Sequence, residues 1–368
     1  MKSVLIISPE KWDDHEVSKH HYAKALAEIG YSVLYLNPPD DSLSSIVIKS
    51  TNYAGLKVVF SPKVARGLKY YPSIIRNLVE RNWLKRLENI ASTKVDIVWL
   101  FENSRFFDMR FADDRLKIYH QVDLNQECNI ELAAKTADIC FAVSNIIKEK
   151  LIDYNKYVYK ITHGTNIPKE RLLLSAEELK YFNIPGAHAV YMGNIDIPCL
   201  DVDLLSQLIK KFPAVNFHFV GGYSKESKLR ILSSEFDNVV LWGKVCSDLI
   251  PSILERADML LVTYKTDQWE YVANPHKFME YFYSGKVIVS TYTDEYSDKC
   301  YLLEMADKSG GFMKVFRNVL ENLDKYNSSD LRAMRIEFAK SHTYKCQLEK
   351  VFQTLNKIGF NLKENKHV

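Results

Sequence analysis

Short apolar runs alternate with amphipathic stretches along the chain, in two successive series. In the first series, an apolar run at 4–7, a helical pattern at 22–29 that ends at Gly30 and an apolar run at 33–36 predict a strand–helix–strand unit. Further strands are expected at 95–101, 117–119, 139–143 and 158–162, with a helix between the second and third of these. Alternation of this kind predicts a parallel sheet covered by helices on both faces.

The second series runs from Ala189 through Val289 and follows a linker at 163–168. A last helix is expected in the tail that begins at His342. We therefore expect an α/β protein with two Rossmann-like domains, residues 1–168 and 169–342, whose parallel sheets face a cleft, and a C-terminal helix in residues 343–368. Neither half contains G-x-G-x-x-G, so dinucleotide binding is not expected.

Length and composition fit this division. A chain of 368 residues is long enough for about two buried cores, and a hydrophobic content of 47% argues against disorder. The six cysteines are scattered without a C-x-x-C pair, so we expect reduced thiols and no structural zinc. The first apolar run is too short for a signal peptide, and no run approaches the roughly 18 apolar residues of a membrane span. These observations predict a cytoplasmic protein.

The most distinctive segment is 274–286, Asn-Pro-His-Lys-Phe-Met-Glu-Tyr-Phe-Tyr-Ser-Gly-Lys, which lies between two apolar runs. We expect Asn274 to be the N-cap of a helix, Pro275 to occupy its first turn, and Gly285 to end it. The N-terminus of a helix carries unpaired N–H groups, so together with Lys277 it can bind a phosphate or diphosphate. Glu280 lies three residues further on and can reach sugar or ribose hydroxyls of the same ligand. The alternative is an ordinary surface ion pair between these two side chains.

This segment resembles the donor-binding signature of GT-B glycosyltransferases of the bacterial polysaccharide type, Ser/Asn-Pro-x-Lys-x-x-Glu-Tyr followed by a small residue and Gly-Lys-x-Val-Val. The resemblance extends to 189–195, 217–222, 241–244 and 248–258. It implies that a nucleoside-diphosphate sugar binds the second domain, with the diphosphate at the helix start beside Lys277 and the ribose on Glu280. It also implies that the terminal helix crosses back to the first domain. Retaining members often carry a second Glu eight residues before the ribose Glu; Val272 stands there, so retention and inversion both stay open.

Other candidate donor contacts follow expected strands of the second domain. They are Gly193, Asn194, Gly222, Lys244, Tyr264 and, with the helix segment, His276. Glycine permits close approach of a phosphate or sugar, a lysine adds positive charge, and aromatic rings, including Trp269 and Tyr271 on the same loop, stack on sugars or bases. The alternatives are simple turns, a solvated lysine and packing within the loop.

Transfer of a sugar to a hydroxyl with inversion needs a base. Asp123 is the favoured candidate because it follows an expected strand of the first domain, and several bacterial polysaccharide glycosyltransferases show a similar Tyr-x-x-x-Asp run. The rival is His15, beside Asp13 and Asp14 in the first strand–helix loop. The alternatives are that Asp123 caps a turn and that His15 belongs to a solvated charged loop.

No metal and no cofactor other than the nucleotide sugar is expected. Asp201-Val202-Asp203 matches the D-x-D pattern of metal-dependent glycosyltransferases, but it directly precedes a helical run at 204–212. Helix capping explains these carboxylates better than a metal site does.

Positive charge is concentrated in one segment. The whole chain has a net charge of +3, whereas residues 57–86 contain eight basic residues and one acidic residue, for a net charge of +7. Apolar and aromatic residues at helix-like spacing accompany them from Leu68 to Leu84, which suits contact with an anionic bilayer. The alternative is a partly buried helix with a solvated basic face. No motif indicates nucleic-acid binding.

Together these features predict a glycosyltransferase that moves a sugar from a nucleoside-diphosphate sugar to a hydroxyl of a saccharide or lipid-linked saccharide. By the resemblance alone, the product is a bacterial cell-surface polysaccharide or glycolipid, made at the inner face of the plasma membrane. Three alternatives stay open: a nucleotide-sugar epimerase of the same fold, an inactive sugar-nucleotide binding protein, and a two-lobed solute receptor, which would need an export signal.

Overall fold

The protein divides into two compact units. The computed structural model describes residues 2–12, 16–124, 128–167, 171–268 and 274–360. Unit 1 comprises Met1–His163 and Tyr344–Val368, and unit 2 comprises Gly164–Thr343. The division therefore lies five residues before the expected boundary at 168, and the last helix belongs to unit 1.

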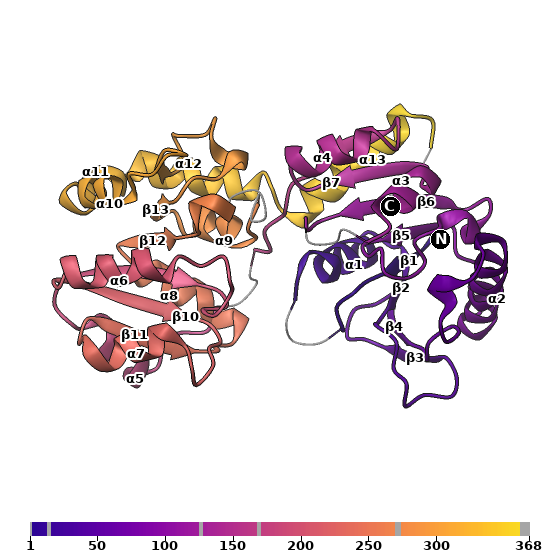
Figure 1. Cartoon of the computed structure of the whole chain (residues 1–368), viewed down its shortest axis with the longest axis horizontal. Helices are drawn as coiled ribbons and strands as arrows, with labels where there is room; N and C mark the ends of the chain where they lie inside the picture. Colours follow the sequence, from indigo (N-terminus) through magenta and orange to yellow (C-terminus); the bar gives the residue numbers. More distant parts are fainter. Residues whose placement is uncertain (1, 13–15, 125–127, 168–170, 269–273, 361–368) are drawn as a thin grey trace. The chain divides into compact units, whose positions relative to one another are not determined.

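Unit 1 is built on an eight-stranded sheet in the order β3-β4-β2-β1-β5-β6-β7-β8. All neighbouring strands are parallel except β3 and β4, which form an antiparallel pair (Figure 1). The elements are β1 (Ser3–Ile7), α1 (Ser18–Glu28), β2 (Ser32–Leu36), β3 (Val47–Ser50), β4 (Leu56–Phe60), η1 (Leu68–Tyr70), α2 (Ser73–Ala91), β5 (Ile97–Leu100), η2 (Met109–Ala112), β6 (Leu116–Gln121), α3 (Ile130–Thr136), β7 (Ile139–Ala142), α4 (Asn145–Ile152), β8 (Val158–Lys160) and α13 (Tyr344–Lys357).

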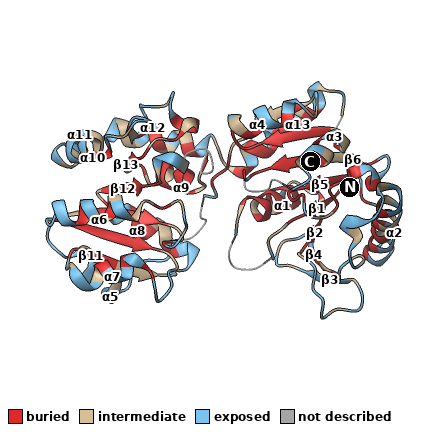
Figure 2. Cartoon of the chain, in the orientation of Figure 1, coloured by how far each residue is buried: buried red, intermediate tan, exposed pale blue. Residues whose placement is uncertain are grey.

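Helices cover both faces of this sheet. One face packs against α1 and α13, which contribute Tyr22, Leu26, Leu348 and Phe352 to a single core. On the opposite face the Cys140 thiol lies 3.8 Å from the carbonyl oxygen of an α3 residue, and α4 contacts β7 and β8. The central strands β1, β2, β5, β6 and β7 are accordingly buried on both sides, and Figure 2 shows the buried residues in red. This arrangement confirms the covered parallel sheet that the apolar runs predict.

Unit 2 has a six-stranded parallel sheet in the order β11-β10-β9-β12-β13-β14. Its elements are α5 (Ala176–Leu179), η3 (Lys180–Phe182), β9 (Ala187–Met192), α6 (Val202–Lys211), β10 (Val215–Val220), α7 (Lys228–Glu235), β11 (Val239–Gly243), η4 (Ser247–Leu249), α8 (Ile250–Arg256), β12 (Met259–Val262), η5 (Thr266–Gln268), α9 (Lys277–Ser284), β13 (Val287–Ser290), η6 (Asp294–Tyr296), β14 (Glu304–Met305), α10 (Phe312–Glu321), α11 (Leu323–Tyr326) and α12 (Ser329–Lys340).

Two separate cores hold the faces of this sheet. Apolar side chains of α6, α7 and α10 pack on one face, and those of α8 and α9 pack on the other. Alternate residues of each strand enter opposite cores: Tyr191 lies in the first and Met192 in the second. Two Rossmann-like units are therefore present, as expected from the sequence.

The basic segment at 57–86 is not one helix. Lys57 lies on β4, a loop and η1 follow, and the helix begins only at Ser73 with Pro72 as its N-cap. The helix-like spacing from Leu68 is therefore wrong for its first five residues, because Pro72 sits at the start of α2, where a proline fits. Within the described ranges, no helix is both long enough and apolar enough to cross a bilayer.

Candidate functional site

In each unit the strand order reverses at one pair of neighbouring strands. In unit 2 the pair is β9 and β12, and in unit 1 it is β1 and β5. Ligands of open α/β sheets bind outside the carboxyl ends of the strands at such a point, because the two loops there diverge to opposite faces. The residues that follow β9 and β12, and those that follow β1 and β5, are therefore where a site is expected.

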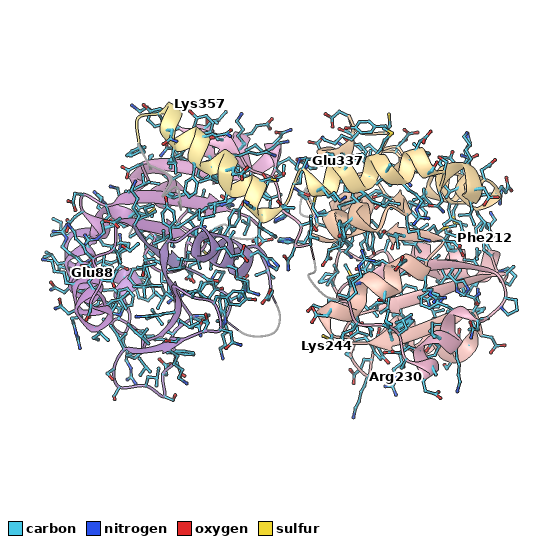
Figure 3. All side chains as sticks on the ribbon, turned by 180° about the vertical axis from the view of Figure 1, so that it is seen from behind. Glu88, Phe212, Arg230, Lys244, Glu337 and Lys357 are labelled. Atoms are coloured by element: carbon cyan, nitrogen blue, oxygen red, sulfur yellow. The ribbon has the colours of Figure 1, made fainter. Side chains whose placement is uncertain are left out.

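Glycines bring two backbones into contact at the end of β9. Gly221 has a φ of 152°, and a Cβ there would overlap the carbonyl oxygen of Gly193, so only glycine fits. The Gly193 amide donates to the Val220 carbonyl at 2.9 Å, which joins the ends of β9 and β10. A Cβ on Gly222 would lie 3.0 Å from Cε of Lys244, an exposed residue labelled in Figure 3. The structure thus brings together Gly193, Gly222 and Lys244, three residues that the sequence proposed separately as donor contacts.

Lys277 is the first residue of α9, and its side chain turns inward. Only 8% of the residue is exposed. Its Nζ lies 3.8 Å from the centroid of the Tyr191 ring and 5.1 Å from that of Tyr264. Among the described residues this buried ammonium has no hydrogen-bond partner. Desolvation lowers the pKa of Lys277 to about 7, and Cys199 and Glu280 oppose this shift.

The two tyrosines beneath this lysine are fixed by the strand ends that carry them. The Tyr191 hydroxyl donates to the carbonyl of Asn194 at 3.3 Å and is hydrogen bonded to Tyr264. Tyr264 is held by its amide, which donates to Oγ1 of Thr291 at 2.9 Å, and by a β-bridge to Leu200. Burial raises the pKa of both phenols, so both stay neutral. Lys277 therefore packs on two uncharged aromatic rings that are held in place by hydrogen bonds.

Asn274 is not the N-cap of α9. That position belongs to His276, whose side chain makes no capping hydrogen bond. The first turn of α9 is closed by two backbone hydrogen bonds between residues three apart, in which the Phe278 amide donates to the Pro275 carbonyl and the Met279 amide to the His276 carbonyl. The side chain of Asn274 instead accepts a hydrogen bond from the Tyr296 hydroxyl at 3.2 Å. Gly285 ends the helix with a φ of 74°, as expected.

Glu280 faces solvent, in contrast to Lys277. The ordinary surface ion pair between them is therefore not formed. Nearby protein atoms displace part of the hydration of Glu280 and raise the pKa of its carboxyl, while Lys277 acts to lower it. Asn194 is also exposed, and its side chain accepts from the Asp196 amide at 3.0 Å.

Asp123 lies just beyond the end of β6 in unit 1, beside a buried lysine that the sequence did not single out. Nζ of Lys19 lies 3.0 Å from a Glu10 carboxylate oxygen and 4.0 Å from one of Asp123. The Lys19 side chain is 3% exposed, whereas that of Asp123 is 60% exposed. Partial desolvation raises the pKa of Asp123; Lys19 opposes this rise and Glu10 adds to it. His15, with Asp13 and Asp14, lies outside the described residues, as do Val272, Trp269 and Tyr271.

Arg105 joins the two loops at the β1/β5 switch point. Its guanidinium donates to the Ser8 carbonyl at 2.8 Å and pairs with Glu102 at 3.0 Å. Arg105, Lys19 and Glu10 do not belong to a recognisable sequence motif. The signal that could have found them is their place directly after β1 and β5, or at the start of the helix after β1, once the strand order is known.

The Asp201-Val202-Asp203 run serves as a helix cap. Asp201 is the N-cap of α6, and its side chain accepts from the Leu204 amide at 2.9 Å. Among the described residues, no group of three or more His, Cys, Asp or Glu side chains is arranged to hold a metal ion.

Neither a family model nor a curated protein sequence matches the chain. Among solved structures, sucrose-phosphate synthase from Thermosynechococcus elongatus superposes with a TM-score of 0.69 at 11% identity, over 98% of this chain and 100% of that one. HepE from Anabaena, in complex with UDP, superposes with a TM-score of 0.70 at 13% sequence identity, over 97% of this chain and 100% of HepE. WaaG, a glycosyltransferase involved in lipopolysaccharide biosynthesis, superposes with a TM-score of 0.61 at 12% sequence identity, over 97% of this chain and 100% of WaaG.

The chain has the GT-B fold. Likeness over nearly the whole length of each protein, with two parallel-dominated sheets of eight and six strands, carries this conclusion and confirms the fold expected from the sequence. At these identities the likeness concerns the fold alone. The candidate site at β9 and β12 thus lies in the second Rossmann-like unit of a GT-B chain.

Proposed function

We propose that this GT-B protein is a glycosyltransferase that takes a nucleoside-diphosphate sugar at the β9/β12 switch point of unit 2. The observation that carries the proposal is the side-chain nitrogen of Lys277, which is buried at this point without a hydrogen-bond partner among the described residues. A buried amine is costly to keep charged without a counter-ion, and an external anion would supply one. The diphosphate of a nucleotide sugar supplies that anion beside the N-terminus of α9.

In the proposed reaction an acceptor hydroxyl oxygen forms a bond to the anomeric carbon while the bond from that carbon to the diphosphate oxygen breaks. Lys277 and the amides at the start of α9 stabilise the charge that develops on the departing diphosphate. No metal is proposed for this role. Unit 1 binds the acceptor, and Asp123 accepts the hydroxyl proton if the reaction inverts; its raised pKa favours a base.

The structural neighbours suggest which acceptor class to propose and which nucleotide to test. WaaG acts in lipopolysaccharide biosynthesis and HepE binds UDP. We propose a saccharide or lipid-linked saccharide of the cell surface as acceptor, with the protein in the cytoplasm, and UDP is the first nucleotide to test.

The first test is a calorimetric binding screen of the folded protein against UDP, GDP, dTDP and CMP and their sugar conjugates, without metal. Lys277→Ala should weaken nucleotide binding by about 1–3 kcal/mol, because a charge-assisted contact is lost. The matched control is Lys314→Ala, an exposed lysine of α10 in the same unit, which should bind normally. Unchanged affinity in Lys277→Ala would remove the assigned site.

The second test separates transfer from donor binding. Asp123→Asn should bind the donor normally and lose transfer to a saccharide acceptor, whereas Asp114→Asn, whose side chain is 82% exposed, should keep both. Wild-type protein that converts its nucleotide sugar to an isomer without any acceptor would instead be an epimerase. Full transfer by Asp123→Asn would point to His15 as the base.

A lipid-linked acceptor requires the protein to reach a membrane, and we propose that the α2 face provides this contact. The α2 face consists of Tyr70, Tyr71, Ile74, Ile75 and Leu78, all exposed, with Tyr70 at 79% and Ile74 at 74%. Exposed basic residues flank it at Arg66, Lys69, Lys85 and Arg86. Arg76, by contrast, is buried and paired with Asp108 at 3.2 Å. An apolar patch with a basic rim fits an anionic bilayer.

Flotation with liposomes tests this contact. The protein should float with vesicles that contain anionic lipid and less with neutral ones, and Ile74→Ser with Leu78→Ser should reduce flotation. Ile90→Ser is the control, since Ile90 is also exposed on α2 but lies outside the α2 face. No flotation with either lipid would favour a solvated surface, and equal flotation with both would show that the basic residues do not direct the contact.

A further inference from the structure

The amine of Lys277 is held in a place that favours its neutral form. Its Nζ is buried over two aromatic rings, and no hydrogen-bond acceptor among the described residues reaches it. A cation–π contact compensates only part of the hydration that an ammonium loses on burial. Without an added anion, the amine therefore gains by releasing its proton.

The titratable groups that face Lys277 do not supply a counter-charge. They are Tyr191 on β9, Cys199 in the loop after it, Tyr264 after β12, and Glu280 on α9 itself. Both tyrosines and the cysteine have raised pKa values and are neutral. Glu280 acts on Lys277 only through space and is exposed to solvent, which weakens its effect.

Glycine lets the main chain at the end of β9 pass close to the amine. A Cβ on Gly193 would lie only 2.9 Å from Nζ, so a residue with a side chain would have to displace Lys277. Gly193 directly follows β9 at the switch point. An anion held beside Nζ would therefore also lie close to the Gly193 main chain.

We propose that the site takes up a proton when it binds a diphosphate, and that Lys277 is the group that receives it. The amine lone pair accepts a proton from solvent as the anion arrives, and the resulting ammonium pairs with a phosphate oxygen; on product release the proton returns to solvent. The pKa of about 7 in the unliganded protein supports this linkage. The inference rests on the proposed function for the identity of the anion.

The coupling predicts how affinity depends on pH. Above the pKa of the free amine, each pH unit should weaken binding tenfold, because protonation must precede the ion pair. Between pH 7.0 and 8.5 the dissociation constant should therefore rise about 15-fold. Binding at pH 8.0 should take up about 0.9 proton per ligand.

Isothermal titration of the full chain with UDP at pH 8.0, in two buffers of different ionisation enthalpy, counts this proton directly. The UDP phosphates are fully ionised there, since their last pKa is near 6. Lys277→Arg is the decisive variant, because its guanidinium is always charged. It should bind UDP without proton uptake and without the 15-fold pH dependence. Lys314→Arg, on the surface of α10, should behave as wild type.

The outcomes separate the two proposals. Binding of UDP by wild type without proton uptake, or uptake that persists in Lys277→Arg, overturns the inference and leaves the nucleotide site intact. GDP and dTDP replace UDP if it does not bind. Folded wild-type protein that binds none of the three overturns both the inference and the proposed function.

Discussion

Two buried lysines occupy comparable places in the two units and differ in what surrounds them. Lys19 is the second residue of α1, near the β1/β5 switch point, and Lys277 is the first residue of α9, near β9/β12. Lys19 lies between the carboxylates of Glu10 and Asp123, whereas Lys277 lies on two neutral aromatic rings. The neighbouring side chains, rather than the position in the fold, decide whether such a lysine forms ion pairs within the protein or is available to bind a ligand.

Replacing Lys277 should give the largest effect and separate stability from function. Lys277→Met keeps the volume and removes a poorly paired buried amine, so the free energy of unfolding should increase by about 3–5 kcal/mol at pH 7, from a pKa of about 7 against an ordinary 10.5. Nucleotide binding should weaken at the same time by about 1–3 kcal/mol, as in Lys277→Ala. Urea unfolding measures the first effect and calorimetry the second.

The pH dependence gives the sign of this effect. Between pH 7 and 10.5 the unfolded chain binds more protons at this lysine than the folded one. The free energy of unfolding of the wild type therefore rises with pH, because the destabilisation caused by Lys277 becomes smaller. The advantage of Lys277→Met should therefore shrink by about 1.4 kcal/mol per pH unit and vanish near pH 10.5. If Lys277→Met were less stable than wild type at pH 7, the buried Lys277 amine would not destabilise the folded protein.

Replacing Lys19 should have the opposite sign and a smaller size. Lys19→Met leaves two carboxylates without their cation, and because both retain contact with water the loss should be about 1–3 kcal/mol. Adding Glu10→Gln should restore part of it. Urea unfolding of the single and double variants checks this, and increased stability in Lys19→Met would remove the contrast between the two lysines.

The smallest expected effect tests the contact between Gly193 and Lys277. Gly193→Ala places a Cβ 2.9 Å from Nζ at a φ of 131°, which should cost about 1–3 kcal/mol. In a Lys277→Ala background the clash is absent and the backbone cost remains, so the penalty should fall by about 0.5–1 kcal/mol. A double-mutant cycle from urea unfolding measures this coupling. If the free-energy changes of the two substitutions were strictly additive, the Lys277 side chain would not contact residue 193.

Local signals predicted the skeleton of the fold well. The apolar runs at 4–7 and 33–36 are strands, and Gly285 ends α9 because its left-handed φ favours glycine. The start of α9 was wrong, because a tertiary hydrogen bond from Tyr296 holds Asn274 away from the cap position. The antiparallel β3–β4 pair was missed, since β3 is only four residues long and mostly exposed, so its apolar residues Val47 and Ile48 do not mark a buried face.

The candidate site was predicted only in part. Sequence spacing selected Lys277 and Glu280 as neighbours on one helix, but the direction of the lysine depends on Tyr191, which lies 86 positions away on β9. Asp123 was found from its place after a strand, whereas Lys19 and Glu10 required the strand order that brings β1 and β6 loops together. Contacts between distant segments leave no local pattern.

The position of α13 has a consequence for synthesis. This helix packs on α1 and completes a core otherwise built from residues before His163. On the ribosome, all of unit 2 is made before α13 emerges, so it can finish folding while the apolar surface around Tyr22 and Tyr31 is still uncovered. The part of the protein that is made first is thus the last to be completed, and it depends on protection from aggregation throughout the synthesis of the other.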